Sequence, residues 1–164
     1  MQYENARPLL KSGDLLAFSR GSFKSWAEFK TMVVRLATRS TYSHVATCWI
    51  TGGRAFAVEA VIPEVRIYPL SKLGNFYWLP LNAPWSNETE EFALSTVGAK
   101  YSQWAAIKAF FKDLGKGNLQ ECAAVTIAIA DVDGIDLGNR QTPDAVVLQA
   151  QLRGSETIYV TQGK

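Results

Sequence analysis

The most apolar helical stretch of this chain runs from Cys122 to Ala130, and it strongly limits how the chain can fold. It is far shorter than the roughly 18 apolar residues that suggest a membrane span, so it predicts a helix in a protein core. Asn118 is suited to cap this helix, and Glu121 has the position of the reciprocal partner in a capping box. The Cys122 thiol is therefore expected in the first turn, where unpaired N–H groups and the helix dipole favour thiolate.

Two interpretations of Cys122 follow from this position. The thiolate is the nucleophilic form of cysteine, so Cys122 is a candidate catalytic residue; alternatively, it is a small buried hydrophobe at the start of a core helix. Cys48, the second cysteine, lies four residues along a predicted strand from His44, roughly 13 Å away, too far for a hydrogen bond. Two cysteines do not make a disulfide scaffold, although a Cys48–Cys122 pair stays open on the sequence alone.

His44 is the only histidine, and it lies in the first strand of a predicted β-hairpin that turns at Gly52-Gly53. If these two glycines form a two-residue loop, Thr51 faces Arg54 and Glu59 lies diagonal to His44 on the same face. A register slip of two would place Glu59 directly opposite, and an odd-residue loop would place the pair on opposite faces. On one face, the carboxylate could fix the imidazole tautomer and stabilise its protonated form. The alternative is an exposed His–Glu pair on a strand.

The remaining pattern predicts an α+β domain in which helices pack against a mostly antiparallel sheet. Proline residues punctuate the middle of the chain and confine its strands. Besides the hairpin, short strands are expected at 12–18, 64–68, 75–81 and 157–160, and helices at 87–97, 102–114 and 142–152. An apolar content of 48% and a charge content of 20% are ordinary for a globular protein, and we expect one domain spanning residues 1–164.

The segment Ser19–Ser40 is long for a connection between two strands, and it is basic. Trp26, Phe29, Val33 and Leu36 recur at helical spacing and mark one apolar face. This pattern fits either an amphipathic basic helix near an anionic surface or a solvated helix packed on the sheet. The net charge of +2 is too small to indicate a nucleic-acid partner.

Short motifs occur along the chain in an order that points to a family. They are Ser12-Gly13-Asp14, Ser43-His44-Val45, Val58-Glu59-Ala60, the Gly98 to Tyr101 element, Glu121-Cys122-Ala123 and Thr142-Pro143-Asp144. Together they resemble the circularly permuted branch of the NlpC and papain-like cysteine hydrolases, which contains the YiiX-like and lecithin:retinol acyltransferase-like proteins. In the unpermuted enzymes the Cys helix precedes the His strand. Ala123 departs from the pattern, since many relatives have Ser there.

This resemblance implies a papain-like α+β fold with Cys122 as nucleophile, His44 as general base and acid, and Glu59 as the residue that orients His44. The backbone N–H of Cys122 is the expected oxyanion donor. The resemblance also implies supporting or substrate-binding positions, which are Tyr42, Ser43, Tyr101 and Asp14.

Three functions are compatible with this arrangement. The first is hydrolysis of an amide, with a peptidoglycan stem peptide as the favoured substrate. The second is a lipid acyl hydrolase or acyltransferase that uses the same triad. The third is a non-catalytic structural component of a phage tail or secretion assembly, with other tail or virion proteins as partners.

No cofactor is expected, and one histidine with two scattered cysteines does not make a zinc site. The first residues have no basic start followed by an apolar core, so no signal peptide is predicted. We therefore expect the protein to be cytoplasmic as made, then virion-associated or released to the cell wall. No transmembrane segment is expected.

Overall fold

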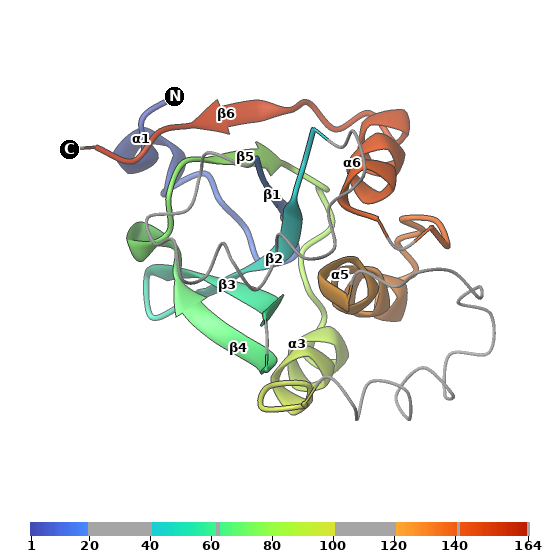
Figure 1. The fold of residues 1–164 in the computed structure, drawn as a ribbon. Coiled ribbons are helices and arrows are strands. Elements are labelled where there is room, and N and C mark those ends of the chain that lie inside the picture. Colours follow the sequence, from blue (N-terminus) through green and yellow to red (C-terminus); the bar gives the residue numbers. More distant parts are fainter. Residues whose placement is uncertain (20–40, 62, 101–120, 141, 164) are drawn as a thin grey trace.

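A computed structural model describes residues 1–19, 41–61, 63–100, 121–140 and 142–163 of the chain. Within them, six strands form one antiparallel sheet with the order β4-β3-β2-β1-β5-β6 (Figure 1). The strands are β1 Leu15–Phe18, β2 His44–Thr51, β3 Arg54–Val61, β4 Glu64–Pro69, β5 Phe76–Leu79 and β6 Ile158–Val160. The predicted α+β class with an antiparallel sheet is confirmed.

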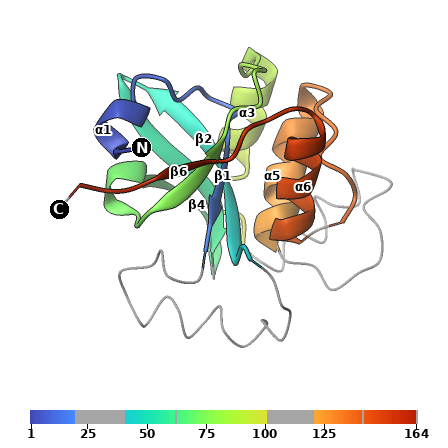
Figure 2. The same cartoon turned by 90° about the horizontal axis from the view of Figure 1, so that it is seen from above.

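The helices are divided between the two faces of the sheet. They are α1 Tyr3–Ala6, η1 Leu70–Lys72, α3 Asn87–Ser95, α5 Glu121–Val132 and α6 Pro143–Leu152. Helices α3, α5 and α6 lie together on one face, and α1 lies on the other (Figure 2). Each face has its own apolar core: Val45 and Val58 pack with α5 and α6, whereas Ala46 and Ala57 pack on the α1 side. The pleat of a strand sends alternate side chains to opposite faces, which explains this division.

Helix α5 is the buried helix that the apolar run predicts. Every side chain from Cys122 to Ala130 is buried, and Ile129 is fully so. The helix packs against both β2 and β3, the two strands of the hairpin. Burial of one side chain such as Ile129 stabilises the fold by about 1.5–3 kcal/mol, so this contact fixes the position of Cys122 firmly.

The β2–β3 hairpin has the register that a two-residue loop produces. Gly52 and Gly53 have φ values of +54° and +70°, which suits the type I′ turn that joins antiparallel strands. Thr51 faces Arg54, as expected, and the paired register continues to Thr47 opposite Val58. Thr47 and Val58 are the last residues in this register, and His44 lies beyond them at the start of β2.

Residues near the two ends of the described chain lie side by side. The Met1 amino group donates to the Tyr159 carbonyl at 2.8 Å, and Gln2 forms a parallel bridge with Thr161. The Tyr3 N–H donates to the Thr161 carbonyl at 2.9 Å. The segment before α1 therefore continues the sheet beside β6.

Most predicted elements occur within a few residues of their expected bounds. Thr142 caps α6 by accepting a hydrogen bond from the Ala145 N–H, and Pro143 takes the first helical position. Helix α1 was not predicted from the sequence. The predicted helix at 102–114 and the segment 20–40 lie outside the described residues. Within the described part of the chain, no helix combines the length and apolar character that crossing a membrane requires.

Candidate active site

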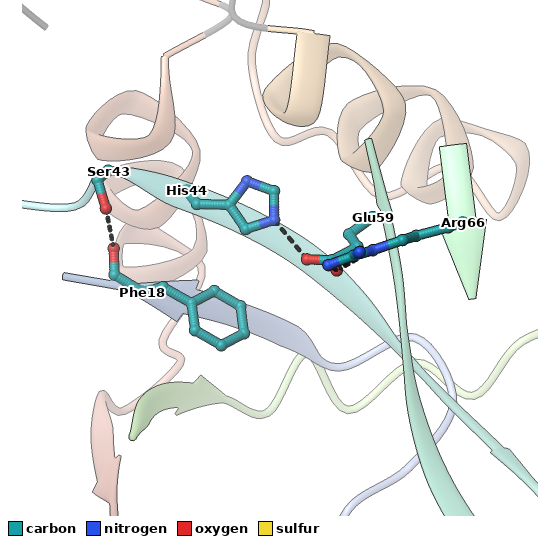
Figure 3. A network of polar contacts seen from close by, with 5 residues as sticks. All are labelled: Phe18, Ser43, His44, Glu59 and Arg66. Carbon is teal, nitrogen blue, oxygen red and sulfur yellow. Dashed lines mark hydrogen bonds and ion pairs between the residues drawn. The ribbon is translucent and has the colours of Figure 1, made fainter. Parts of the chain in front are cut away.

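His44 and Glu59 meet through a buried hydrogen bond. His44 Nε2 lies 2.8 Å from Glu59 Oε2, and each residue is only 1% exposed (Figure 3). The last pair of the β2–β3 register is Thr47 opposite Val58, and Glu59 is the next residue of β3, so its long side chain meets His44 beyond the paired part of the strands. Phe18 of β1 packs beside the imidazole, with ring centroids 5.6 Å apart. The imidazole is therefore held on one side by a carboxylate and on another by an aromatic ring.

Arg66 of β4 occupies the other oxygen of the same carboxylate. It lies directly opposite Glu59 in the β3–β4 register. Its Nε and Nη2 atoms are 2.9 and 2.8 Å from Glu59 Oε1. Figure 3 shows Glu59 between His44 and Arg66. The buried carboxylate thus has a separate partner for each oxygen.

Cys122 lies in the first turn of α5. Its thiol and the His44 side chain are near enough for each to shift the pKa of the other. Glu59 occupies His44 Nε2, and Arg66 occupies the other oxygen of Glu59. The groups therefore follow in the order Cys122, His44, Glu59 and Arg66.

The backbone groups of Val45 of β2 and Ala123 of α5 also lower the pKa of the Cys122 thiol. The Cys48 N–H donates to the Asp14 carbonyl beside β1, so along β2 the N–H of Val45 points to the opposite, β3 side. Thr47 is the last residue of β2 in the β2–β3 register, so Val45 lies beyond the paired part of the strand.

These contacts change the protonation of the thiol and the imidazole in opposite directions. Burial acts against charge on either group, but the hydrogen bonds and charges between Cys122 and His44 oppose it. As a result the pKa of the Cys122 thiol falls below its usual value, with the N–H groups of Val45 and Ala123 contributing. For His44, burial is likewise overcome by Cys122 and Glu59, and its pKa rises to about 10. Both shifts favour a thiolate–imidazolium pair over a neutral thiol and a neutral imidazole.

Two of the predicted supporting residues, Tyr42 and Ser43, directly precede His44 in the chain. The Ser43 hydroxyl donates to the Phe18 carbonyl at 3.1 Å and ties the start of β2 to β1. The Tyr42 N–H donates to Asp144 Oδ1 at 3.0 Å, which ties the same segment to the start of α6. The contacts of both residues therefore fix the backbone that carries His44.

The other two predicted supporting residues differ from this pair. Asp14 is buried, and its carboxylate accepts hydrogen bonds from the Lys11 and Leu81 N–H groups and from Trp78 Nε1. These contacts join the start of β1 to β5, so the observed role of Asp14 is to hold the sheet together. Tyr101, like the proposed cap Asn118, lies outside the described residues.

The two cysteines are both free thiols, which settles the disulfide alternative for this structure. Cys122 packs in the core on the α5 side of the sheet, whereas Cys48 packs in the core on the α1 side. Burial, together with the charge of nearby Asp14, raises the pKa of Cys48. Cys48 is therefore a poor nucleophile beside Cys122.

Sequence reasoning missed Arg66, although a signal for it was present. Ile62-Pro63 separates two strands by two residues, and a loop of that length places Val61 opposite Glu64. Counting back along both strands then puts Arg66 opposite Glu59. The strand at Glu64 was predicted, but its pairing partner on β3 was not worked out.

Comparison with known proteins gives a match in structure alone. No protein-family profile matches the sequence, and no curated protein matches it either. A crystal structure of the metalloprotein yiiX from Escherichia coli O157:H7 matches with a TM-score of 0.51 and 20% sequence identity. The match covers 90% of this chain and 87% of that chain.

The described residues of this chain do not fit a metal site. No three His, Cys, Asp or Glu side chains among them are grouped so that they could hold an ion. The Arg66 guanidinium also takes one oxygen of Glu59, where a cation would meet like charge. What the comparison does show is architecture: this chain has the α+β fold of yiiX, the fold that its resemblance to the circularly permuted NlpC and papain-like hydrolases implied.

Proposed function

We propose that this protein is a cysteine hydrolase that cleaves an amide bond, with a peptidoglycan stem peptide as substrate. The observation that carries the proposal is the buried hydrogen bond between His44 and Glu59, beside a Cys122 thiol whose pKa is lowered by His44. A nucleophile, a base in contact with it and a group that orients the base are the parts that nucleophilic acyl transfer requires.

The proposed reaction has two stages. The Cys122 proton passes to the His44 imidazole before the attack, and the thiolate sulfur then bonds to the carbonyl carbon. The C–N bond breaks as the amine takes that proton from His44. In the second stage a water molecule gives a proton to His44 and adds to the thioester carbon. The C–S bond breaks, which releases the carboxylic acid product and returns Cys122 and His44 to their starting state.

The protonation of His44 favours an amide over an ester as the bond that is cleaved. An amine is a poor leaving group unless it is protonated as it departs, so amide cleavage needs a general acid. The raised pKa of His44, about 10, keeps the imidazole protonated at neutral pH. The site is therefore equipped for the step that distinguishes amide from ester hydrolysis.

The test is incubation of the protein with purified peptidoglycan and, separately, with acyl-ester lipids, followed by mass spectrometry of the products. We expect new stem-peptide termini from peptidoglycan, and no such product from Cys122→Ala or His44→Ala. Cys48→Ala is the matched control, since it removes the other buried thiol and should leave turnover intact.

Other outcomes would redirect the assignment. Release of fatty acid alone would support the lipid hydrolase instead. If the Cys122→Ala protein cleaves peptidoglycan as fast as the wild type, the nucleophile is wrong. If neither substrate is cleaved by folded protein, the non-catalytic assembly component becomes the better hypothesis.

A further inference from the structure

Arg66 is bound to Glu59 in a way that sets it apart from an ordinary surface cation. Two of its guanidinium nitrogens converge on one oxygen of a carboxylate that is 1% exposed. Its Cζ atom lies 4.5 Å from the centre of the Tyr68 ring, on the same face of β4. Ring contact and paired hydrogen bonds fix the guanidinium in one orientation.

A buried carboxylate needs a partner whose charge does not vary. In the proposed reaction His44 gives up its proton to the leaving amine, and for part of the cycle it is neutral. During that interval an isolated Glu59 would be a buried anion without a cation, a state that favours protonation of the carboxyl group. Arginine keeps its charge throughout, since it is not deprotonated in proteins.

We infer that Arg66 is a positioning residue of this site, which keeps Glu59 ionised and oriented while His44 changes its protonation state. The inference rests on the hydrolase function proposed above. Arg66 acts through Glu59 and is not expected to touch substrate. The geometry alone carries this assignment, because each oxygen of Glu59 has its own partner.

The electrostatics of the site agree with this role. Despite its burial, Glu59 has a pKa below the usual value, because His44 and then Arg66 stabilise the charged form. Among the described residues, the further titratable side chains on elements packed against β3 are Cys48 of β2, Cys122 and Asp131 of α5, Glu64 and Tyr68 of β4, and Lys72 of η1. Cys122 acts on Glu59 through His44. Glu64 is exposed, and η1 follows Pro69 at the other end of the strand pair.

The experiment follows the rate of Cys122 alkylation by iodoacetamide as a function of pH, which needs no substrate. In Arg66→Met, Glu59 should protonate at higher pH, so the imidazolium loses its anionic partner and the thiolate is lost earlier on acidification. We expect the acid limb of the profile to move up by about one pH unit, the lower end of the effect of one adjacent charge. Arg66→Lys should restore most of the shift.

Two further variants separate this role from a structural one. Arg54→Met removes an exposed arginine at the far end of β3, the strand that carries Glu59. The acid limb of its alkylation profile should match that of the wild type. In a Glu59→Gln background, Arg66→Met should cause no further shift, because the group on which Arg66 acts is gone. Thermal melts run in parallel confirm that each variant is folded.

The inference and the proposed function fail in different ways. An unshifted acid limb in folded Arg66→Met, with normal Cys122 reactivity in the wild type, overturns the role of Arg66 alone. An equal shift with and without the Glu59→Gln change overturns it as well. A wild-type Cys122 that alkylates no faster than Cys48 overturns the proposed function itself.

Discussion

His44 is the only histidine in the chain, so the NMR signals of its imidazole report on the candidate site without overlap from other histidines. Its pKa of about 10, against 6.5 for an unperturbed imidazole, makes a strong prediction. At pH 8 about 99% of the His44 side chains should be protonated, whereas an ordinary histidine would be about 3% protonated. Imidazole ¹⁵N and ¹³C shifts distinguish the two forms directly.

The informative perturbation is Cys122→Ala. Burial is the largest influence on the His44 pKa and lowers it, and Cys122 is the first of the two groups that raise it, ahead of Glu59. Removing the sulfur leaves Glu59 alone to oppose burial, so the pKa of His44 should fall in the variant. A titration from pH 5 to 11 measures both proteins under the same conditions.

The same pair predicts how stability depends on pH. A folded-state His44 pKa above 6.5 contributes stability that is fully present below pH 6.5 and is lost as the pH rises towards about 10. A Cys122 pKa below 9.0 contributes stability that is present above pH 9.0 and is lost as the pH falls through the folded value. The two contributions have opposite slopes and offset each other where their pH windows overlap. Urea melts of the wild type at a series of pH values above 6.5 should therefore show a smaller loss of stability than the His44 contribution alone would cause.

One result would refute this reasoning. If the His44 signals of folded wild-type protein titrate near pH 6.5, the imidazole is not paired with a thiolate. The same conclusion follows if Cys122→Ala leaves the titration unchanged. Cys48→Ala serves as the control and should leave the His44 titration as it is, because Cys48 packs in the other core.

Three further predictions concern stability and turnover. Gly13→Ala should lower the free energy of unfolding by at least about 1–3 kcal/mol in urea melts, because φ is +98° and the new Cβ would lie 2.8 Å from the Ala83 carbonyl oxygen. Gly53→Ala, with φ of +70° and open space around it, should lose less; an equal loss would mean that the close contact does not matter. Ile129→Ala should cost about 2–5 kcal/mol in the same assay, and a loss below 1 kcal/mol would contradict tight packing of α5. Glu59→Gln should keep measurable turnover, since its amide oxygen still accepts from His44, while Glu59→Ala should be slower; the reverse order would exclude an orienting role.

The elements that could be predicted from the sequence are those with a strong local cause. The apolar side chains after Cys122 are stable only when they are buried in a core. The Gly52-Gly53 turn sets the β2–β3 register, which brings Glu59 near His44. Asp14 shows where such reasoning stops: its motif suggested a place in the site, but its hydrogen bonds to Trp78 and Leu81 come from residues distant in the chain. No local pattern encodes such contacts.

The effect of the Val45 backbone on the thiol pKa was equally hard to foresee. It depends on where the β2–β3 pairing ends and on the packing of α5 against the two strands, which no local pattern encodes. The role of Arg66 falls between these cases. To predict the contact between Arg66 and Glu59, the registers of the β2–β3 and β3–β4 pairs would have to be counted together.

The side-by-side placement of residues 1–3 and 159–161 means that the order of the elements along the chain is nearly independent of their arrangement in space. A short covalent join between these ends, with one new break between the exposed residues Asn82 and Pro84, would rewrite the sequence so that α5 precedes β1 to β5. Cys122 would then come before His44 and Glu59, the chain order of the unpermuted hydrolases, while every strand kept its neighbours. Two gene orders can thus encode one site, because the join links segments that already lie side by side and the break falls in the connection between β5 and α3.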